Sequence, residues 1–479
     1  MKKILLINPP RVGGKPVVRE ERFEHRDFEV IYPPLTLLYC AAQIRKHLGA
    51  KVKLYFLDAM GYNLSLEQVK NRFKEIDPDI VITRFAFDTY REDLDLLSEL
   101  KKIKSDVITI TRNKIVSDVP ALMEKYLRKF RGIDYFVTVE QDSVIHKVVK
   151  KIIGKKIPNS CAFIRGNKLK ITPREKEIED LDEIAFPAYD LLPKNPWPYK
   201  SSLFPKDFTL ILSSRGCPNQ CSFCAYRNMK WRFRSPEDVF EEIKMLYDKY
   251  HIRNFVYFDD TISINKERCL KICKLLRKSK MQLKYAICTR VNNVDEGLLL
   301  AWKKTGLEEI SFGVESGSEK ILKMCGKNIN KKQIRVAFGL CKKLKIKSLT
   351  LVILGLPGET KETIAETKSL VNEINPFYLQ YSLCIPFPNT PAYHYYKSKG
   401  FLLHEDYSKY NPLTLEPVIR TEDLTPVELI KEKERAYREF ILRPKFVLSK
   451  ISLTYWRWNI RGFVMFTKRL YGLFKGYIR

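Results

Sequence analysis

The chain has 479 residues, 45% of them hydrophobic, and a formal net charge of +30. This length and apolar content predict two or three globular domains. No apolar run approaches the ~18 residues needed to cross a bilayer, so membrane-spanning segments are excluded.

Basic and acidic residues are mixed through most of the chain, despite the basic excess. A mixed surface is typical of a lysine-rich coat, and nucleic acid is an unlikely partner on this evidence. The chain has eleven cysteines, and its first residues lack the pattern of a signal peptide. Both features favour a reducing, cytoplasmic location.

Residues 1–160 alternate short apolar runs with amphipathic helical stretches, the pattern of a doubly wound α/β domain. The expected strands are 3–9, 51–58, 79–85, 107–112 and 134–139. Residues 161–205 are rich in proline and charge, which predicts an extended linker.

Strands separated by helices recur in residues 206–400. The expected strands are 208–214, 254–260, 284–290, 307–316, 348–355 and 378–384. Six strand–helix units predict a partial, open (β/α)6 barrel with its site at the carboxyl ends of the strands.

Three cysteines, Cys217, Cys221 and Cys224, follow the first of these six strands with the spacing C-x3-C-x2-C. A [4Fe–4S] cluster takes four ligands, so three close thiolates hold three irons and leave the fourth open for a substrate or cofactor. Phe223 stands beside the third cysteine, where its ring can shield a cluster. Zinc with a distant fourth ligand and a chance grouping are the alternatives.

The cysteine motif, with an aromatic residue before the third cysteine, resembles that of the radical S-adenosylmethionine (SAM) superfamily. The resemblance implies that Cys217, Cys221 and Cys224 are the metal-binding and catalytic cysteines. It further implies that the open iron binds the amino and carboxylate groups of SAM. One electron, from a donor such as ferredoxin or flavodoxin, then cleaves SAM to a 5′-deoxyadenosyl radical.

Residues at other strand ends extend the resemblance. Arg290 is suited to pair with a carboxylate through two parallel hydrogen bonds. Asp259 stands where many relatives have Gly-Gly-Glu, a departure that recurs in one large subgroup. The implied cofactor-binding residues are Phe223, Asp259, Arg290, Glu315, Ser316, Gly355 and Pro357.

The N-terminal domain resembles the cobalamin-binding domain of one radical SAM class. Asn8-Pro9-Pro10, the prolines at 33–34 and Asp58 match that class in type and order. The chain departs from it in lacking Asp-x-His-x-x-Gly and the glycine pair after the fourth strand, where Arg112-Asn113-Lys114 stand instead. Cobalamin is therefore left open, against a retained fold whose pocket is filled.

Residues 401–479 are expected to form a helical C-terminal extension. After Glu439 no acidic residue occurs, while residues 441–479 contain nine lysines and arginines interleaved with aromatics. This pattern favours peripheral contact with an anionic membrane, on its inner face, over packing across the barrel or RNA binding.

Together these features predict a radical SAM enzyme that functionalises a C–H bond by methylation, cyclisation or oxidation. The expected substrate is a hydrophobic small molecule resembling a lipid or tetrapyrrole. The alternatives are an enzyme that modifies tRNA or protein and a non-catalytic cluster-binding interaction protein. Methylthiotransferases carry further cysteines in their N-terminal domain, whereas only Cys40 and Cys161 precede this barrel.

Overall fold

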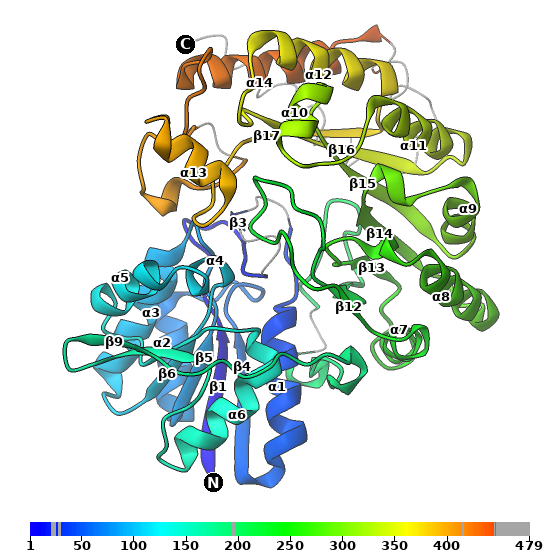
Figure 1. Cartoon of the computed structure of the whole chain (residues 1–479). Coiled ribbons are helices and arrows are strands. Elements are labelled where there is room, and N and C mark those ends of the chain that lie inside the picture. Colours follow the sequence, from blue (N-terminus) through cyan, green and yellow to red (C-terminus); the bar gives the residue numbers. More distant parts are fainter. Residues whose placement is uncertain (21–24, 27–29, 194–196, 414–415, 445, 447–479) are drawn as a thin grey trace.

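The computed structural model describes all residues except 21–24, 27–29, 194–196, 414–415, 445 and 447–479. The described chain forms two α/β domains, followed by a C-terminal helical region (Figure 1). No helix in these residues is both long and apolar enough to cross a membrane.

The N-terminal domain has a seven-stranded sheet in the order β4-β1-β5-β6-β7-β8-β9. Its first five strands are parallel, and in chain order they run 2-1-3-4-5, the order of a flavodoxin-like doubly wound sheet. The predicted fold and all five predicted strands are thus confirmed. These strands are β1 (Lys2–Asn8), β4 (Val52–Asp58), β5 (Ile80–Thr83), β6 (Ile108–Thr111) and β7 (Tyr135–Val137).

Helices cover both faces of this sheet because side chains on a buried strand alternate between its faces. Ile4 and Leu6 of β1 pack in the same cluster as the helices α1 and α6, whereas Leu5 and Ile7 pack with the opposite layer. The helices are α1 (Leu35–Leu48), α2 (Leu66–Ile76), α3 (Tyr90–Ile103), α4 (Lys114–Ser117), α5 (Pro120–Lys129) and α6 (Gln141–Ile153).

Two hairpins accompany the N-terminal sheet. A small one, β2 (Val17–Val18) with β3 (His25–Arg26), follows β1 in the chain. The other, β8 (Cys161–Arg165) with β9 (Lys168–Ile171), extends the sheet by two antiparallel strands. This second hairpin occupies the start of the region expected as a linker, and the proline-rich connection to the barrel follows it. Its strands are short, and β9 is mostly exposed, so the sequence carries no strong strand signal there.

The second domain has a six-stranded parallel sheet whose spatial order equals its chain order, with β10 and β17 at its edges. This arrangement confirms the partial barrel. The strands are β10 (Phe208–Ile211), β13 (Asn254–Tyr257), β14 (Lys284–Thr289), β15 (Leu307–Glu315), β16 (Lys347–Leu354) and β17 (Tyr378–Leu383). A short pair, β11 (Ser214–Arg215) and β12 (Arg232–Phe233), brackets the cysteine motif.

Polar caps begin the helices that separate the barrel strands. The side chain before each helix accepts a hydrogen bond from the backbone N–H three residues on, which satisfies a donor the helix leaves free. The capping residues are Ser235, Asn265, Asp295, Asn330 and Thr360. The helices are α7 (Pro236–Tyr250), α8 (Lys266–Ser279), α9 (Glu296–Lys304), α11 (Lys331–Lys343) and α12 (Lys361–Ile374), with the short α10 (Glu319–Met324) before α11.

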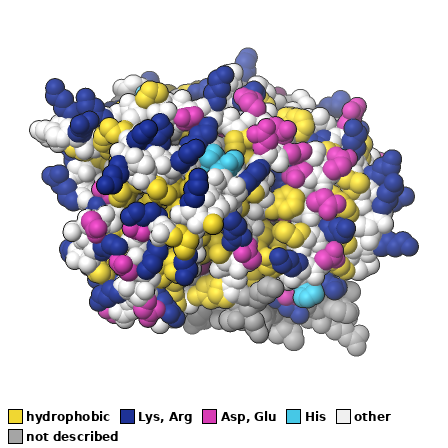
Figure 2. All heavy atoms as spheres, turned by 90° about the horizontal axis from the view of Figure 1, so that it is seen from below, with side chains coloured by type: hydrophobic (Ala, Val, Ile, Leu, Met, Phe, Trp, Pro, Cys, Tyr) yellow, Lys and Arg dark blue, Asp and Glu magenta, His cyan; other side chains and the backbone are white. Residues whose placement is uncertain are grey.

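The C-terminal region closes over the last strands of the barrel. It contains α13 (Pro391–Ser398) and α14 (Pro426–Ile441), and α14 packs against α12 and β17. The Tyr437 hydroxyl lies 2.8 Å from the backbone N of Tyr381 and accepts its hydrogen bond. The basic tail predicted to contact membranes lies almost entirely outside the described residues. On the face shown in Figure 2, basic and acidic side chains are interspersed, as their mixing in the sequence indicates.

Candidate active site

The cysteine motif lies in the loop between β11 and β12. Gly216, with a φ of +84°, turns the chain into this loop, and a Cβ there would collide with the carbonyl oxygen of Lys230. The backbone N–H of Gly216 donates to Asp260 (3.0 Å), and that of Met229 donates to the carbonyl of Cys217 (2.9 Å). These contacts hold both ends of the loop, which we call the cluster loop (residues 215–226).

Each of the three cysteine sulfurs has a polar hydrogen near it. Asn219 Nδ2 lies 3.1 Å from Cys217 Sγ, the backbone N of Tyr226 lies 3.3 Å from Cys224 Sγ, and Arg290 Nη1 lies 3.7 Å from Cys221 Sγ. Such donors stabilise thiolates and tune iron–sulfur clusters.

The donor chemistry of the loop fits a [4Fe–4S] cluster with one open iron. Within the described part of the chain, no group of three or more His, Cys, Asp or Glu side chains converges on a single metal ion. A cluster needs no such convergence, because each cysteine binds a different iron.

Arg290, Lys327 and Glu315 form a buried polar chain that leads away from Cys221. Arg290 follows β14, and besides approaching the Cys221 sulfur it donates to the backbone carbonyl of Lys327. Lys327 Nζ lies 2.7 Å from Glu315 Oε1, and these side chains are only 7% and 11% exposed. Gly313 makes room for the pair, since a Cβ there would lie 2.8 Å from Lys327 Nζ and collide with the Glu315 carboxylate.

Lys327 was not among the residues expected from the sequence. It stands in a loop after α10, twelve residues beyond Glu315, and no motif marks it. The one available signal is physical, because a carboxylate buried at a strand end requires a cation or several hydrogen-bond donors. Glu315 and Lys327 together offer an acceptor and a donor beside Cys221.

Two of the expected cofactor-binding residues, Asp259 and Ser316, make hydrogen bonds within the protein. Asp259 accepts from the backbone N and hydroxyl of Ser213 (2.8 and 2.5 Å) and from the hydroxyl of Ser214 (2.6 Å). Ser316 is fully buried, and its hydroxyl lies 3.1 Å from that of Thr367. Their geometry suits holding the strand ends in place. The neighbouring Asp260 faces the space between the domains.

The turn after β16 contains Gly355 and Pro357, and both are buried. Gly355 has a φ of +80°, and its backbone N–H donates to the carboxylate of Glu359. Burial raises the pKa of Glu359 to about 8, although the N–H groups of Gly355 and Leu356 oppose this shift. Phe223 is half-buried and packs against the hydrophobic core that includes this side of the barrel.

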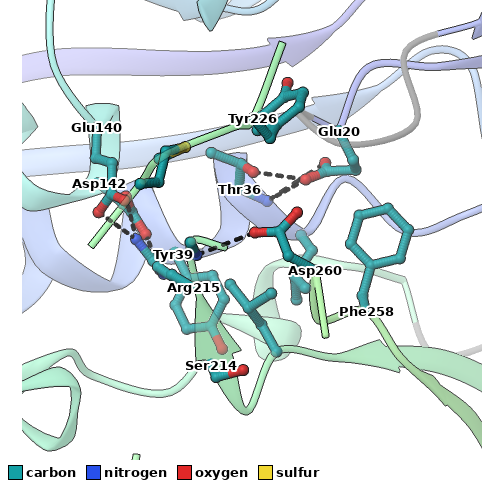
Figure 3. Close-up of a pocket in the computed structure, with 14 residues that line it drawn as sticks. Glu20, Thr36, Tyr39, Glu140, Asp142, Ser214, Arg215, Tyr226, Phe258 and Asp260 are labelled. Atoms are coloured by element: carbon teal, nitrogen blue, oxygen red, sulfur yellow. Dashed lines mark hydrogen bonds and ion pairs between the residues drawn. The ribbon is translucent and has the colours of Figure 1, made fainter. Parts of the chain in front are cut away.

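A cavity of about 70 Å³ lies where the carboxyl ends of the two sheets meet (Figure 3). Residues from both domains line it, among them Glu20, Tyr39 and Glu140 of the N-terminal domain and Arg215, Phe258 and Asp260 of the barrel. Arg215 pairs with Glu140 and Asp142 across the domain boundary. The Glu20 carboxylate accepts from the Thr36 backbone N (3.1 Å), and burial raises the pKa of Glu20 to about 7.

The residues at the carboxyl ends of β6 and β7 are large and buried. Asn113 caps α4 and donates to the carbonyl of Phe85 (3.1 Å), while Arg112 and Lys114 are 4% and 8% exposed. The three side chains expected to occupy the place of the glycine pair therefore lie inside the protein.

Comparison with known proteins agrees with this geometry. Residues 211–371 match the model of the Radical SAM superfamily, and this match includes the cluster loop, Arg290, Glu315 and Lys327. An uncharacterised methyltransferase of Pyrococcus horikoshii is 29% identical over 459 residues, which are 94% of either chain.

A second relative is the anaerobic magnesium-protoporphyrin IX monomethyl ester cyclase of Rubrivivax gelatinosus. It is 27% identical over 428 residues, 87% of this chain and 75% of the cyclase. Among solved structures, the radical SAM methyltransferase TsrM of Kitasatospora setae, with cobalamin and a [4Fe–4S] cluster bound, aligns with a TM-score of 0.64. The alignment covers 90% of this chain and 82% of TsrM at 15% identity, so it establishes the shared two-domain fold.

Proposed function

Because the chain is a radical SAM enzyme, binding a [4Fe–4S] cluster and SAM, we propose that it removes a hydrogen atom from an unactivated carbon of a small-molecule substrate. The observation that carries this proposal is the buried polar chain that leads from Cys221 through Arg290 to Lys327 and Glu315. It places two cations, Arg290 and Lys327, and the carboxylate of Glu315 beside the cluster loop. When bound, the cluster would pass one electron from an external donor to SAM, which would break into methionine and a 5′-deoxyadenosyl radical.

Each residue of this polar chain has a role within this proposal. Arg290 and Lys327 supply positive charge for the SAM carboxylate, and Glu315 accepts a hydrogen bond from the SAM amino group. Gly355 and Pro357 shape the turn that lies along the adenosyl group. Met324 lies against this turn and leaves no room for a side chain at Gly358, since its Cε would lie 2.5 Å from a Cβ there.

The two curated relatives point to different outcomes, methyl transfer and ring closure. One is named a methyltransferase, and the other a cyclase that acts on magnesium-protoporphyrin IX monomethyl ester. A tetrapyrrole or comparably hydrophobic small molecule is the substrate class we infer from the second name.

Methyl transfer in the cobalamin class needs a bound corrin, and the residues of this N-terminal domain do not fit its nucleotide tail. Arg112, Asn113 and Lys114 are buried where that tail needs room, and ion pairs close the boundary between the domains.

The test is anaerobic reconstitution followed by SAM cleavage. Wild-type protein should hold about one [4Fe–4S] cluster per chain and form 5′-deoxyadenosine. Cys221→Ala should lose both properties, whereas the matched control Cys40→Ala, in the core of the N-terminal domain, should keep them. Deoxyadenosine formation by Cys221→Ala would contradict the proposal.

The outcome of the reaction is tested separately. Metabolites that accumulate in a gene-deletion strain are supplied to the reconstituted enzyme, and the product mass is measured. Loss of hydrogen without added carbon indicates cyclisation or oxidation, and the gain of a CH2 unit indicates methylation.

A further inference from the structure

The carboxyl edge of a doubly wound sheet normally binds a ligand, at the point where neighbouring strands connect in opposite directions. In the N-terminal sheet this point lies between β1 and β5. Here Arg19 fills it: its guanidinium donates to both oxygens of Asp93 (2.9 and 2.6 Å) and to the carbonyls of Pro9 and Pro10. The Arg19 and Asp93 side chains are only 3% and 1% exposed. The Arg19 side chain therefore occupies the point between β1 and β5.

At the end of β6, Lys114 pairs with Asp118 of its own domain (2.7 Å) and also contacts the barrel. Its Nζ donates to the carbonyl of Ala225 (3.3 Å) and lies 5.2 Å from the centre of the Tyr226 ring. Ala225 directly follows Cys224. This lysine therefore contacts the cluster loop immediately after its last cysteine.

At the end of β7, two acidic residues contact the other end of the same loop. The Arg215 guanidinium donates to both carboxylate oxygens of Asp142, and its Nη1 lies 3.0 Å from Glu140 Oε2. Arg232, which pairs with Arg215 in the hairpin of β11 and β12, donates to the other oxygen of Glu140. All four side chains are at most 11% exposed.

We propose that the carboxyl edge of the N-terminal sheet is a clamp for the cluster loop, with Asp142, Glu140 and Lys114 as positioning residues. This inference rests on the proposed radical SAM function, because it assigns the clamp to the loop that holds the cluster. Arg215 stands two residues before Cys217 and Ala225 one residue after Cys224, so the clamp fixes the loop at both ends. The domain thus acts on the cysteines through backbone placement rather than through a ligand of its own.

The chemistry of the contacts supports a positioning role. Paired, buried charges with bidentate geometry hold two chain segments in one relative orientation, which a loose hydrophobic contact does not. Removing one carboxylate leaves the partner guanidinium buried with fewer acceptors, and the segment is then free to move.

The experiment compares Asp142→Asn, Lys114→Met and the conservative Asp142→Glu with wild type. The control is Lys70→Met, which removes a partly exposed ion pair with Glu99 elsewhere in the same domain. Hydrogen exchange of the peptide covering residues 214–226 is measured on the full chain. The reduced, reconstituted proteins are then examined by electron paramagnetic resonance with and without SAM.

We expect exchange of the loop peptide to be about tenfold faster or more in Asp142→Asn, because hydrogen bonds to charged groups are lost. The spectral change caused by SAM should be weakened in Asp142→Asn and Lys114→Met, and largely restored in Asp142→Glu. Lys114→Met also serves as the milder variant if Asp142→Asn does not fold. Wild-type exchange and spectra in a folded Asp142→Asn or Lys114→Met protein would overturn the clamp. Absence of SAM cleavage by wild type would instead overturn the proposed function.

Discussion

Lys327 Nζ lies 2.7 Å from Glu315 Oε1, and this ion pair is buried beside the loop that carries the cluster cysteines. Glu315 has a φ of +64°, an unusual conformation for a residue other than glycine. The strand end is therefore held in a strained conformation next to a buried charge pair. Such features are retained where the surrounding structure and the function require them.

Removing the positive charge of this pair should destabilise the protein and weaken SAM binding. In Lys327→Met the carboxylate of Glu315 stays buried without its cation, which is expected to lower the free energy of unfolding by about 3–5 kcal/mol. The double variant Lys327→Met with Glu315→Gln should regain most of this stability but not its affinity for SAM. Thermal unfolding and equilibrium dialysis with SAM measure the two effects.

The control for this pair is Lys331→Met, which breaks the more exposed pair with Glu366 and should change stability by about 1 kcal/mol or less. Equal melting temperatures for Lys327→Met and Lys331→Met would show that the pair at Glu315 is not a buried one. Full SAM affinity in the double variant would remove both residues from the cofactor site.

The carboxyl group of Glu359 should make stability depend on pH. Burial raises its pKa from the ordinary 4.5 to about 8. Because the pKa is raised in the folded state, its contribution to stability is complete below 4.5 and is lost as the pH rises through 8. Glu359→Gln cannot ionise, so its stability relative to wild type should rise across this range by an amount on the order of a few kcal/mol.

Thermal unfolding of both proteins from about pH 5 to pH 9 measures the difference. Glu362→Gln, in the first turn of α12 just after Glu359, is the control and should show no such rise. A difference between Glu359→Gln and wild type that does not change with pH would mean that the carboxyl ionises normally in the folded protein.

Hydroxocobalamin should not remain bound to this chain. Arg112, Asn113 and Lys114, which stand where the resemblance to the cobalamin-binding domain implies room for a nucleotide tail, are buried, and the clamp residues hold the domains together. After mixing and gel filtration, the protein fraction is expected to carry no stoichiometric corrin absorbance. TsrM, whose structure contains cobalamin, is the positive control. A stoichiometric corrin spectrum would show that the charged boundary opens, and would favour methylation as the outcome.

The strands and the cysteine loop could be predicted from the sequence because their signals are local. An apolar run between turn residues indicates a strand, and three cysteines within eight residues need no tertiary information. The sequence could not show which of Asp259 and Asp260 contacts the cluster loop. Only the fold shows that Asp259 accepts three hydrogen bonds from Ser213 and Ser214 while Asp260 contacts the loop at Gly216.

The clamp was beyond prediction for a related reason. Asp142 and Arg215 are 73 residues apart and belong to different domains, so neither position predicts the other. Lys114 was noted only as a bulky residue in place of a glycine. The structure adds that its amino group reaches the cluster loop. Local sequence patterns thus predicted the cluster cysteines, whereas the residues that hold the cluster loop in place depend on how the two sheets meet.

The basic tail is predicted from its sequence alone to bind anionic membranes. Residues 447–479 contain seven lysines and arginines, three tryptophan or tyrosine residues at 455–458, and no acidic residue. At about 1 kcal/mol for each cation near an anionic surface, four engaged cations would hold the protein on vesicles at low salt. Full-length protein should therefore float with phosphatidylglycerol vesicles and be released as the salt concentration rises.

The matched control for flotation is a chain truncated after Phe446. This end point keeps the contacts of Arg443 with Asn372 and Asn375, and the packing of Phe446 on Phe440, so the described fold should be preserved. The truncated chain should stay at the bottom of the gradient and still cleave SAM. If it floats as well as the full-length protein, the tail is not the membrane contact.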